Sequence, residues 1–169
     1  MSLSMYQASI PVFTRALSNL RGVVQKGEAY ANEKGFSPDV LAQTRLIADM
    51  LPLSRQVQIA CDMVKNGSFR LAGLEAPAFD DDETTLAQLV ERIDRTLAVI
   101  RDLRAEQIDG SETRAIHLKM RTGELQFEGQ SYLLDFVLPN LFFHATTTYA
   151  ILREAGVPIG KMDFIGAQR

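Results

Sequence analysis

The sequence is poor in the residues that build disulfides and metal sites. Its 169 residues include one cysteine, Cys61, two histidines and no tryptophan. A single cysteine excludes an internal disulfide and is typical of a reducing compartment, so we expect a cytoplasmic protein. The two histidines, His117 and His144, are too few for a three-histidine metal site.

Long apolar runs and an excess of positive charge are also missing. No apolar run approaches the roughly 18 residues of a membrane span, and residues 1–7 lack the basic start and hydrophobic stretch of a signal peptide. The net charge is −3, with Lys and Arg scattered among acids, which argues against nucleic-acid binding. The composition, 46% apolar and 23% charged, is that of a globular protein, and the length fits one domain over residues 1–169.

The sequence predicts both ends of the first helix. Ser4 and Gln7 form a capping-box pattern, in which each side chain satisfies a free backbone N–H. Gly35 is the residue that most easily takes the left-handed conformation ending a helix. One helical face carries the apolar residues Phe13, Leu17, Leu20 and Val24.

A second helix is predicted from residues 37–39 to about Gly73. Ser-Pro-Asp at 37–39 supplies an N-cap, a first-turn proline and an acid near the positive end of the helix dipole. The predicted core face consists of Leu46, Met50, Leu53, Val57, Ala60 and Val64. This alternation of four and three is typical of near-parallel helices in a bundle.

A third helix follows an acidic run. Residues 80–83 precede Leu86, and we interpret these acids as helix caps and solvated side chains rather than a calcium loop. The apolar face of this helix is Leu86, Leu89, Ile93, Leu97 and Ile100.

The periodicity then changes to two between Asp109 and Gly129. Apolar and polar residues alternate over 116–121 and again over 124–128, on either side of Thr122-Gly123. This pattern predicts a β-hairpin with His117 on its polar face.

A fourth helix is predicted from about Ser131 to Glu154, ended by Gly156 and Pro158. The tail over 157–169 is apolar enough to dock on the helices. We therefore predict an all-α fold, a four-helix bundle with short links and a small β-hairpin between the third and fourth helices.

Polar residues interrupt the core face of the fourth helix. That face is Leu134, Val137, Leu141, His144, Thr148 and Ile151. Asn140 lies one turn before His144, and residues four apart project into one space. Asp49 and Gln56 flank the core face of the second helix. We predict a ligand pocket lined by His144, Asn140, Gln56, Asp49 and Thr148.

Three prolines locate this pocket. Pro11, Pro52 and Pro139 each lie inside a predicted helix, where proline removes one backbone hydrogen bond and crowds the preceding turn. Kinks in three helices would open a gap between them, and we expect the pocket at that level.

The same residues have structural interpretations. A single histidine on an apolar face is more often a hydrogen-bonded core residue than a ligand. Cys61 is most simply a small buried hydrophobe. The aromatic residues of the last helix cover two of its sides, so one side is expected to face the core and the other a partner; these residues are Phe136, Phe142, Phe143 and Tyr149.

Several segments resemble the DinB-like (YfiT-like) superfamily, in a bacterial branch known only as a domain of unknown function. They are residues 139–153 (PNLFFHATTTYAILR), 156–160 (GVPIG), 49–62 (DMLPLSRQVQIACD) and 79–84 (FDDDET). The resemblance spans nearly the whole chain. It implies a four-helix bundle, often a homodimer, with a mid-bundle metal site in many relatives.

The resemblance also implies a ligand set that this chain lacks. Relatives hold the metal with one histidine on the second helix and two histidines, four residues apart, on the last. His144 matches the second of that pair, Asn140 occupies the place of the first, and the second helix has no histidine. Zn²⁺ or Ni²⁺ would meet one imidazole, with Asp49, Gln56 or Asp62 as substitutes, which is a degenerate site.

Three functions remain open at this point. The chain is a dimeric bundle that binds a small ligand or a partner around His144, a metal- or thiol-dependent transferase or isomerase, or a structural interaction module. Sequence does not decide whether it is an enzyme.

Overall fold

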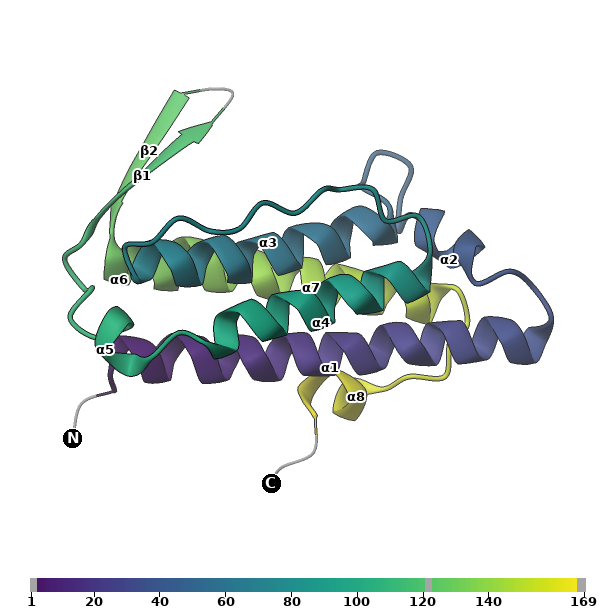
Figure 1. Ribbon diagram of the computed structural model, residues 1–169. Helices are drawn as coiled ribbons and strands as arrows, with labels where there is room; N and C mark the ends of the chain where they lie inside the picture. Colours follow the sequence, from purple (N-terminus) through teal and green to yellow (C-terminus); the bar gives the residue numbers. More distant parts are fainter. Residues whose placement is uncertain (1–2, 121–122, 167–169) are drawn as a thin grey trace.

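The helices and strands are those of a computed structural model, which describes residues 3–120 and 123–166 (Figure 1). Four long helices form the bundle: α1 (Met5–Lys34), α3 (Leu53–Leu71), α4 (Leu86–Arg101) and α7 (Leu138–Glu154). The other elements are α2 (Asp39–Gln43), α5 (Ala105–Ile108), β1 (Ala115–Met120), β2 (Gly123–Glu128), α6 (Gly129–Ser131), the π-helical turn η1 (Tyr132–Val137) and α8 (Lys161–Ile165). The predicted fold class, an all-α bundle with a hairpin before the last long helix, is confirmed.

The ends of α1 form as the sequence predicts. Ser4 accepts from the Gln7 backbone N–H at 3.3 Å, while the Gln7 side chain accepts from the Ser4 N–H at 3.2 Å. Gly35 ends the helix in the left-handed conformation at φ 77°. Pro11 lies inside α1, as predicted. The predicted core face of α1 is buried.

The predicted second helix is wrong in its first half. Only α2 is helical there, the chain is irregular from Thr44 to Pro52, and α3 begins at Leu53. Pro52 is therefore the N-cap of α3, with φ −68° and ψ 164°, and not a kink inside a helix. The cause is steric, since proline disfavours the helical conformation of the residue before it. Leu46 is 40% exposed, whereas Leu53 and Val57 are fully buried.

The link between α3 and α4 is long rather than short. Residues 72–85 run over the length of the bundle, so that α3 and α4 are parallel neighbours (Figure 1). The four long helices therefore form a bundle with one crossover connection rather than a simple up-and-down bundle.

The last long helix contains a π-helical turn just before Pro139. Helical structure is continuous from Gly129 to Glu154, but η1 occupies Tyr132–Val137. An i→i+5 turn holds an extra residue and rotates the residues before it around the axis. The predicted core face is accordingly displaced at its start, where Leu133 is fully buried and Leu134 is 46% exposed.

The hairpin projects from one end of the bundle, whereas the tail docks on its side (Figure 1). β1 and β2 are antiparallel with Ile116 opposite Phe127 and His117 opposite Gln126. Ile116 is buried and His117 exposed, as predicted. Of the predicted turn Thr122-Gly123, Thr122 lies outside the described residues and Gly123 begins β2. The tail docks as predicted: Val157 is fully buried and α8 packs on α1 (Figure 1). None of the described helices is both long and apolar enough to cross a membrane.

Candidate functional site

His144 of α7 meets Gln56 of α3 inside the bundle. The imidazole Nδ1 lies 2.7 Å from Gln56 Oε1. Gln56 is 2% exposed and His144 9% exposed, so the pair is nearly enclosed. Neither ring nitrogen of His144 is among the fully buried, unpaired side-chain atoms of the described residues. The two helices place these side chains because each residue lies in series with core residues of its own helix.

The second hydrogen bond of Gln56 fixes the protonation of His144. Gln56 Nε2 donates to the Leu51 carbonyl at 3.0 Å, and a carbonyl can only accept. Oε1 is therefore the atom facing the histidine, and His144 Nδ1 must carry the proton it donates. Burial lowers the pKa of the imidazole below its ordinary value. The neutral ring thus keeps its lone pair on Nε2.

The other predicted pocket residues do not join this pair. Asn140 Nδ2 donates to the Phe136 carbonyl at 2.7 Å, and Thr148 Oγ1 donates to the His144 carbonyl at 3.0 Å. Both bonds lie within the last helix. Asp49 is exposed in the irregular segment before α3. The structure brings together two of the five predicted residues, and the pocket itself stays a prediction.

The donor set around His144 does not fit a metal ion. Its Nδ1 is engaged by Gln56, and the Asn140 amide is bonded to its own helix. Among residues 3–120 and 123–166, no group of three His, Cys, Asp or Glu side chains is placed to hold a metal. A single imidazole without a carboxylate or thiolate beside it is a poor site for Zn²⁺ or Ni²⁺.

A groove runs along α7 beside this pair. It has a volume of about 450 Å³ and lies between the outer side of α7 and Leu46. Phe143 and Thr147, which flank His144 along the helix, line it. The Phe143 ring stands edge-on to the imidazole, with centroids 5.2 Å apart. The groove is mostly apolar, and its lining reaches the residues on either side of His144 along α7 without including His144 or Gln56.

A buried arginine, which sequence reasoning missed, joins the crossover segment to the bundle. Arg92 of α4 is fully buried, and its Nη1 lies 3.0 Å from Glu83 Oε1. Its Nη2 lies 3.0 Å from Asp62 Oδ1 and 2.9 Å from Asp81 Oδ1. The Asp80 carbonyl accepts from Nη1 at 2.8 Å.

These contacts correct the interpretation of the acidic run as helix caps. The cap of α4 is Thr85, whose side chain accepts from the Gln88 N–H at 3.2 Å. Asp81 and Glu83 instead face cations. Although burial alone raises it, ion pairs with Arg55 and Arg92 hold the pKa of the Asp81 carboxyl below its ordinary value. The sequence feature that could have indicated this cluster is Arg92 itself, because a charged residue three positions after Leu89 lies on the core side of the helix.

We interpret this cluster as structural. Four side chains other than Arg92 also engage the crossover segment: Arg55 with Asp81, Gln58 with Glu83, Lys65 with the Pro77 carbonyl, and Arg95 over the Phe79 ring. Arg55, Lys65 and Arg92 each contact a group of the segment, and Asp62 pairs with Lys65 and Arg92. Arg92 is fully buried, and its Nε has no hydrogen-bond partner among the described residues. The arrangement holds the crossover segment against α3 and α4.

Cys61 lies next to this cluster and is inert by its surroundings. It is fully buried in α3. Burial raises the pKa of its thiol to about 12, so the nucleophilic thiolate is absent at neutral pH. The interpretation of Cys61 as a small buried hydrophobe fits this placement.

Comparison with known proteins finds similarity over nearly the whole chain. Residues 5–165 match the model of a family described as a domain of unknown function (DUF1993). A crystal structure of a DinB family member protein from Shewanella denitrificans is similar, with a TM-score of 0.88 and 38% identity over 96% of this chain and 92% of that chain. No curated protein matches.

Proposed function

The chain belongs to the DUF1993 family of DinB-like four-helix bundles, and from this premise we propose that it binds a small molecule at the His144–Gln56 pair without a three-histidine metal centre. The observation that carries the proposal is the 2.7 Å bond between His144 Nδ1 and Gln56 Oε1. It orients a neutral imidazole so that Nε2 is a fixed acceptor for a ligand.

The surroundings define the class of ligand. An Nε2 lone pair accepts a hydrogen bond from a hydroxyl, an amine or a thiol. The wall beside it is apolar, since Phe142, Phe143 and Pro139 line the groove along α7. A ligand that joins an apolar body to one hydrogen-bond donor complements both features.

Elemental analysis separates this proposal from the metalloenzyme alternative. Protein purified without chelator is expected to carry less than about a tenth of an equivalent of Zn²⁺ or Ni²⁺, because one imidazole supplies too little binding free energy. A stoichiometric metal removed by His144→Ala would contradict the proposal.

Ligand-observed NMR tests the binding itself. The ligands are phenols, anilines and low-molecular-weight thiols, and the proteins are the wild type, His144→Ala and the exposed-histidine control His117→Ala. We expect at least one donor class to bind the wild type and the control but not His144→Ala, with the melting temperature of all three measured in parallel. Equal binding by His144→Ala would reject the site. Preferred binding of a thiol would favour the thiol-dependent transferase or isomerase.

The homodimer and the cytoplasmic location implied at the sequence level stay predictions. For the dimer, the candidate surface is the outer side of α7, where Phe142 is 40% and Phe143 56% exposed. A second copy covering this side would also cover the groove, so the oligomeric state bears on ligand access.

A further inference from the structure

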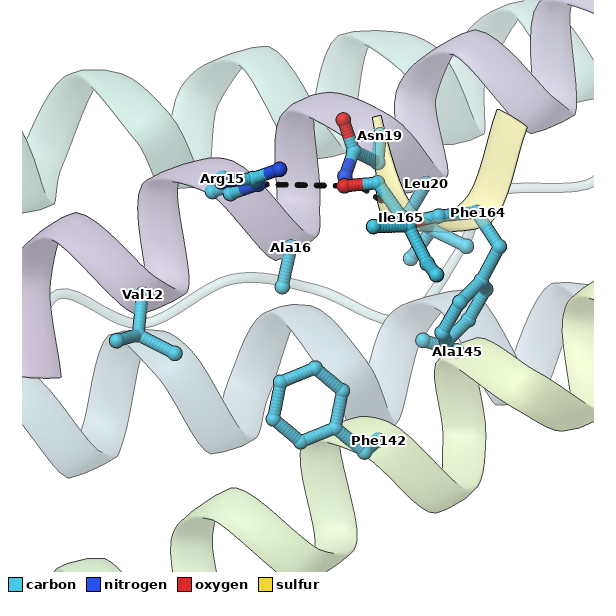
Figure 2. Close-up of a pocket in the computed structure, with 9 residues that line it drawn as sticks. All are labelled: Val12, Arg15, Ala16, Asn19, Leu20, Phe142, Ala145, Phe164 and Ile165. Atoms are coloured by element: carbon cyan, nitrogen blue, oxygen red, sulfur yellow. Dashed lines mark hydrogen bonds between the residues drawn. The ribbon is translucent and has the colours of Figure 1, made fainter. Parts of the chain in front are cut away.

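A second hollow adjoins the groove at Phe142, which lines both, and lies where α8 bridges α1 and α7 (Figure 2). It has a volume of about 260 Å³. Its wall is apolar and comes from three helices: Val12, Ala16 and Leu20 of α1, Phe142 and Ala145 of α7, and Phe164 of α8. Ala16 and Ala145 are small, so the two long helices leave unfilled space between them at this level.

We propose that this hollow binds a small amphipathic carboxylate, with its apolar tail inside and its carboxylate on the guanidinium of Arg15. The proposal does not depend on the His144–Gln56 site, because neither of those residues lines the hollow. A cavity of about 150 Å³ with an apolar lining holds a benzene molecule. The larger volume here accommodates a short alkyl or aryl-alkyl chain.

The charge at the edge of the hollow selects an anion. Arg15 is the one charged side chain among the lining residues. Its Nε donates to the Ile165 carbonyl at 3.2 Å, as the dashed line in Figure 2 shows. Within the described residues, no acid forms an ion pair with Arg15. Its terminal nitrogens can therefore take a carboxylate, which matches the guanidinium fork.

α8 forms one wall of the hollow and is held by polar contacts. Asn19 Nδ2 donates to the Phe164 carbonyl at 3.0 Å, and Lys26 pairs with Asp163 at 2.5 Å. The Phe164 ring also packs edge-on to Tyr149 of α7, with ring centroids 6.0 Å apart, so apolar contacts add to the polar ones. The bond from Arg15 Nε to the Ile165 carbonyl holds the guanidinium at the rim of the hollow.

Isothermal titration with octanoate tests the proposal, with 1-octanol as the uncharged comparator. We expect one octanoate per chain in the wild type. Arg15→Gln is expected to weaken octanoate binding about five-fold and leave 1-octanol unchanged, because only the carboxylate uses the charge. Arg101→Gln, an exposed arginine in the last turn of α4, is the matched control and is expected to bind like the wild type.

Filling the hollow tests its position. Ala16→Phe is expected to abolish binding of both ligands with the helical circular dichroism retained. Because an added ring can also disturb packing, nuclear Overhauser contacts from the octanoate methyl group to the Phe142 and Phe164 rings provide a second measurement in the wild type.

Three results would overturn the proposal. These are no binding at millimolar octanoate, binding that Ala16→Phe leaves intact, and Overhauser contacts to residues outside the hollow. Loss of binding in His144→Ala would not follow from this proposal, so its outcome and that of the His144 site are distinguishable.

Discussion

At the scale of single residues, the informative feature is that the Gln56 amide determines which nitrogen of the His144 imidazole carries the proton. Gln56 uses its nitrogen on the Leu51 carbonyl, which leaves only an oxygen for His144. The histidine is therefore a hydrogen-bonded residue inside the bundle, 9% exposed, and in our proposal its Nε2 is the acceptor for a ligand. The structural interpretation concerns Nδ1, which bonds Gln56, and the proposed function concerns Nε2 of the same ring.

This arrangement predicts a pH dependence of stability. Because burial lowers the pKa of His144 in the folded state, the unfolded state binds that proton more readily. The free energy of unfolding should therefore fall as the pH drops below the ordinary histidine pKa of about 6.5, until the pH reaches the lower folded-state pKa. His144→Gln should remove this part of the dependence, and urea unfolding at a series of pH values measures it.

The control for this measurement is the chain's other histidine. His117→Gln changes an exposed side chain and should keep the wild-type dependence. An unchanged slope in His144→Gln would show that its imidazole is not the group responsible.

Cys61 gives a second prediction at this scale. Its thiol is buried and its pKa is raised to about 12, so it should react with a disulfide reagent such as DTNB only when the chain opens. We expect the labelling rate in native buffer to be lower than that in denaturant by several orders of magnitude, following the opening free energy. Fast native labelling would contradict the buried placement.

Sequence reasoning predicted the His144–Gln56 proximity but not its form. Periodicity placed both residues near the core, because position along a helix fixes the side of that helix. It placed Asp49 there as well, and failed because Asp49 is not in a helix. Asn140 and Thr148 were placed on the correct helix, but their bonds to carbonyls four residues earlier are local choices that spacing does not reveal.

At the scale of elements, the crossover segment is the main departure from the sequence prediction. Acids before a helix ordinarily cap it, and the short sequence around them gives no sign of a distant arginine. Arg92 was predictable only as an anomaly, a charge on the core side of an otherwise apolar helix face. The π-helical turn before Pro139 was likewise invisible, because periodicity assumes that each residue advances the helix equally.

The Arg92 cluster predicts a large stability effect. Arg92→Met removes the cation and leaves the buried Glu83 carboxylate without its ion-pair partner, while Asp62 and Asp81 keep Lys65 and Arg55. We expect the free energy of unfolding to fall by about 3–5 kcal/mol, as for other buried charges that lose their partner. Chemical denaturation measures it, and Arg101→Met serves as the exposed control on the same helix. A loss below about 1 kcal/mol would show that the segment is held by its other contacts.

At the scale of the whole molecule, the outer side of α7 is an exposed surface without charge. Residues 138–152 contain no Asp, Glu, Lys or Arg, although this helix has an exposed side. A surface helix ordinarily carries charge on that side. The bundle itself was predictable, because four apolar helix faces have few ways to be buried together.

The dimer prediction follows from this surface. If two copies pair through it, Phe143→Ser should shift the molar mass measured by light scattering from dimer towards monomer at micromolar concentration. Val40→Ser changes a residue 60% exposed on α2 and should leave the mass unchanged. A monomeric wild type would remove the dimer from consideration and leave the groove open to ligands.

The crossover between α3 and α4 also affects the folding rate of this chain. An up-and-down bundle gains each helix contact across a short loop, whereas α4 can pack beside its parallel neighbour α3 only after residues 72–85 have returned along the bundle (Figure 1). Closing a longer loop costs conformational entropy before any contact offsets it, and a higher mean sequence separation slows folding. The chain should therefore refold more slowly than a simple up-and-down bundle of equal length and stability. Because Arg92 can find its carboxylates only when that return is complete, its replacement should accelerate unfolding far more than it slows refolding.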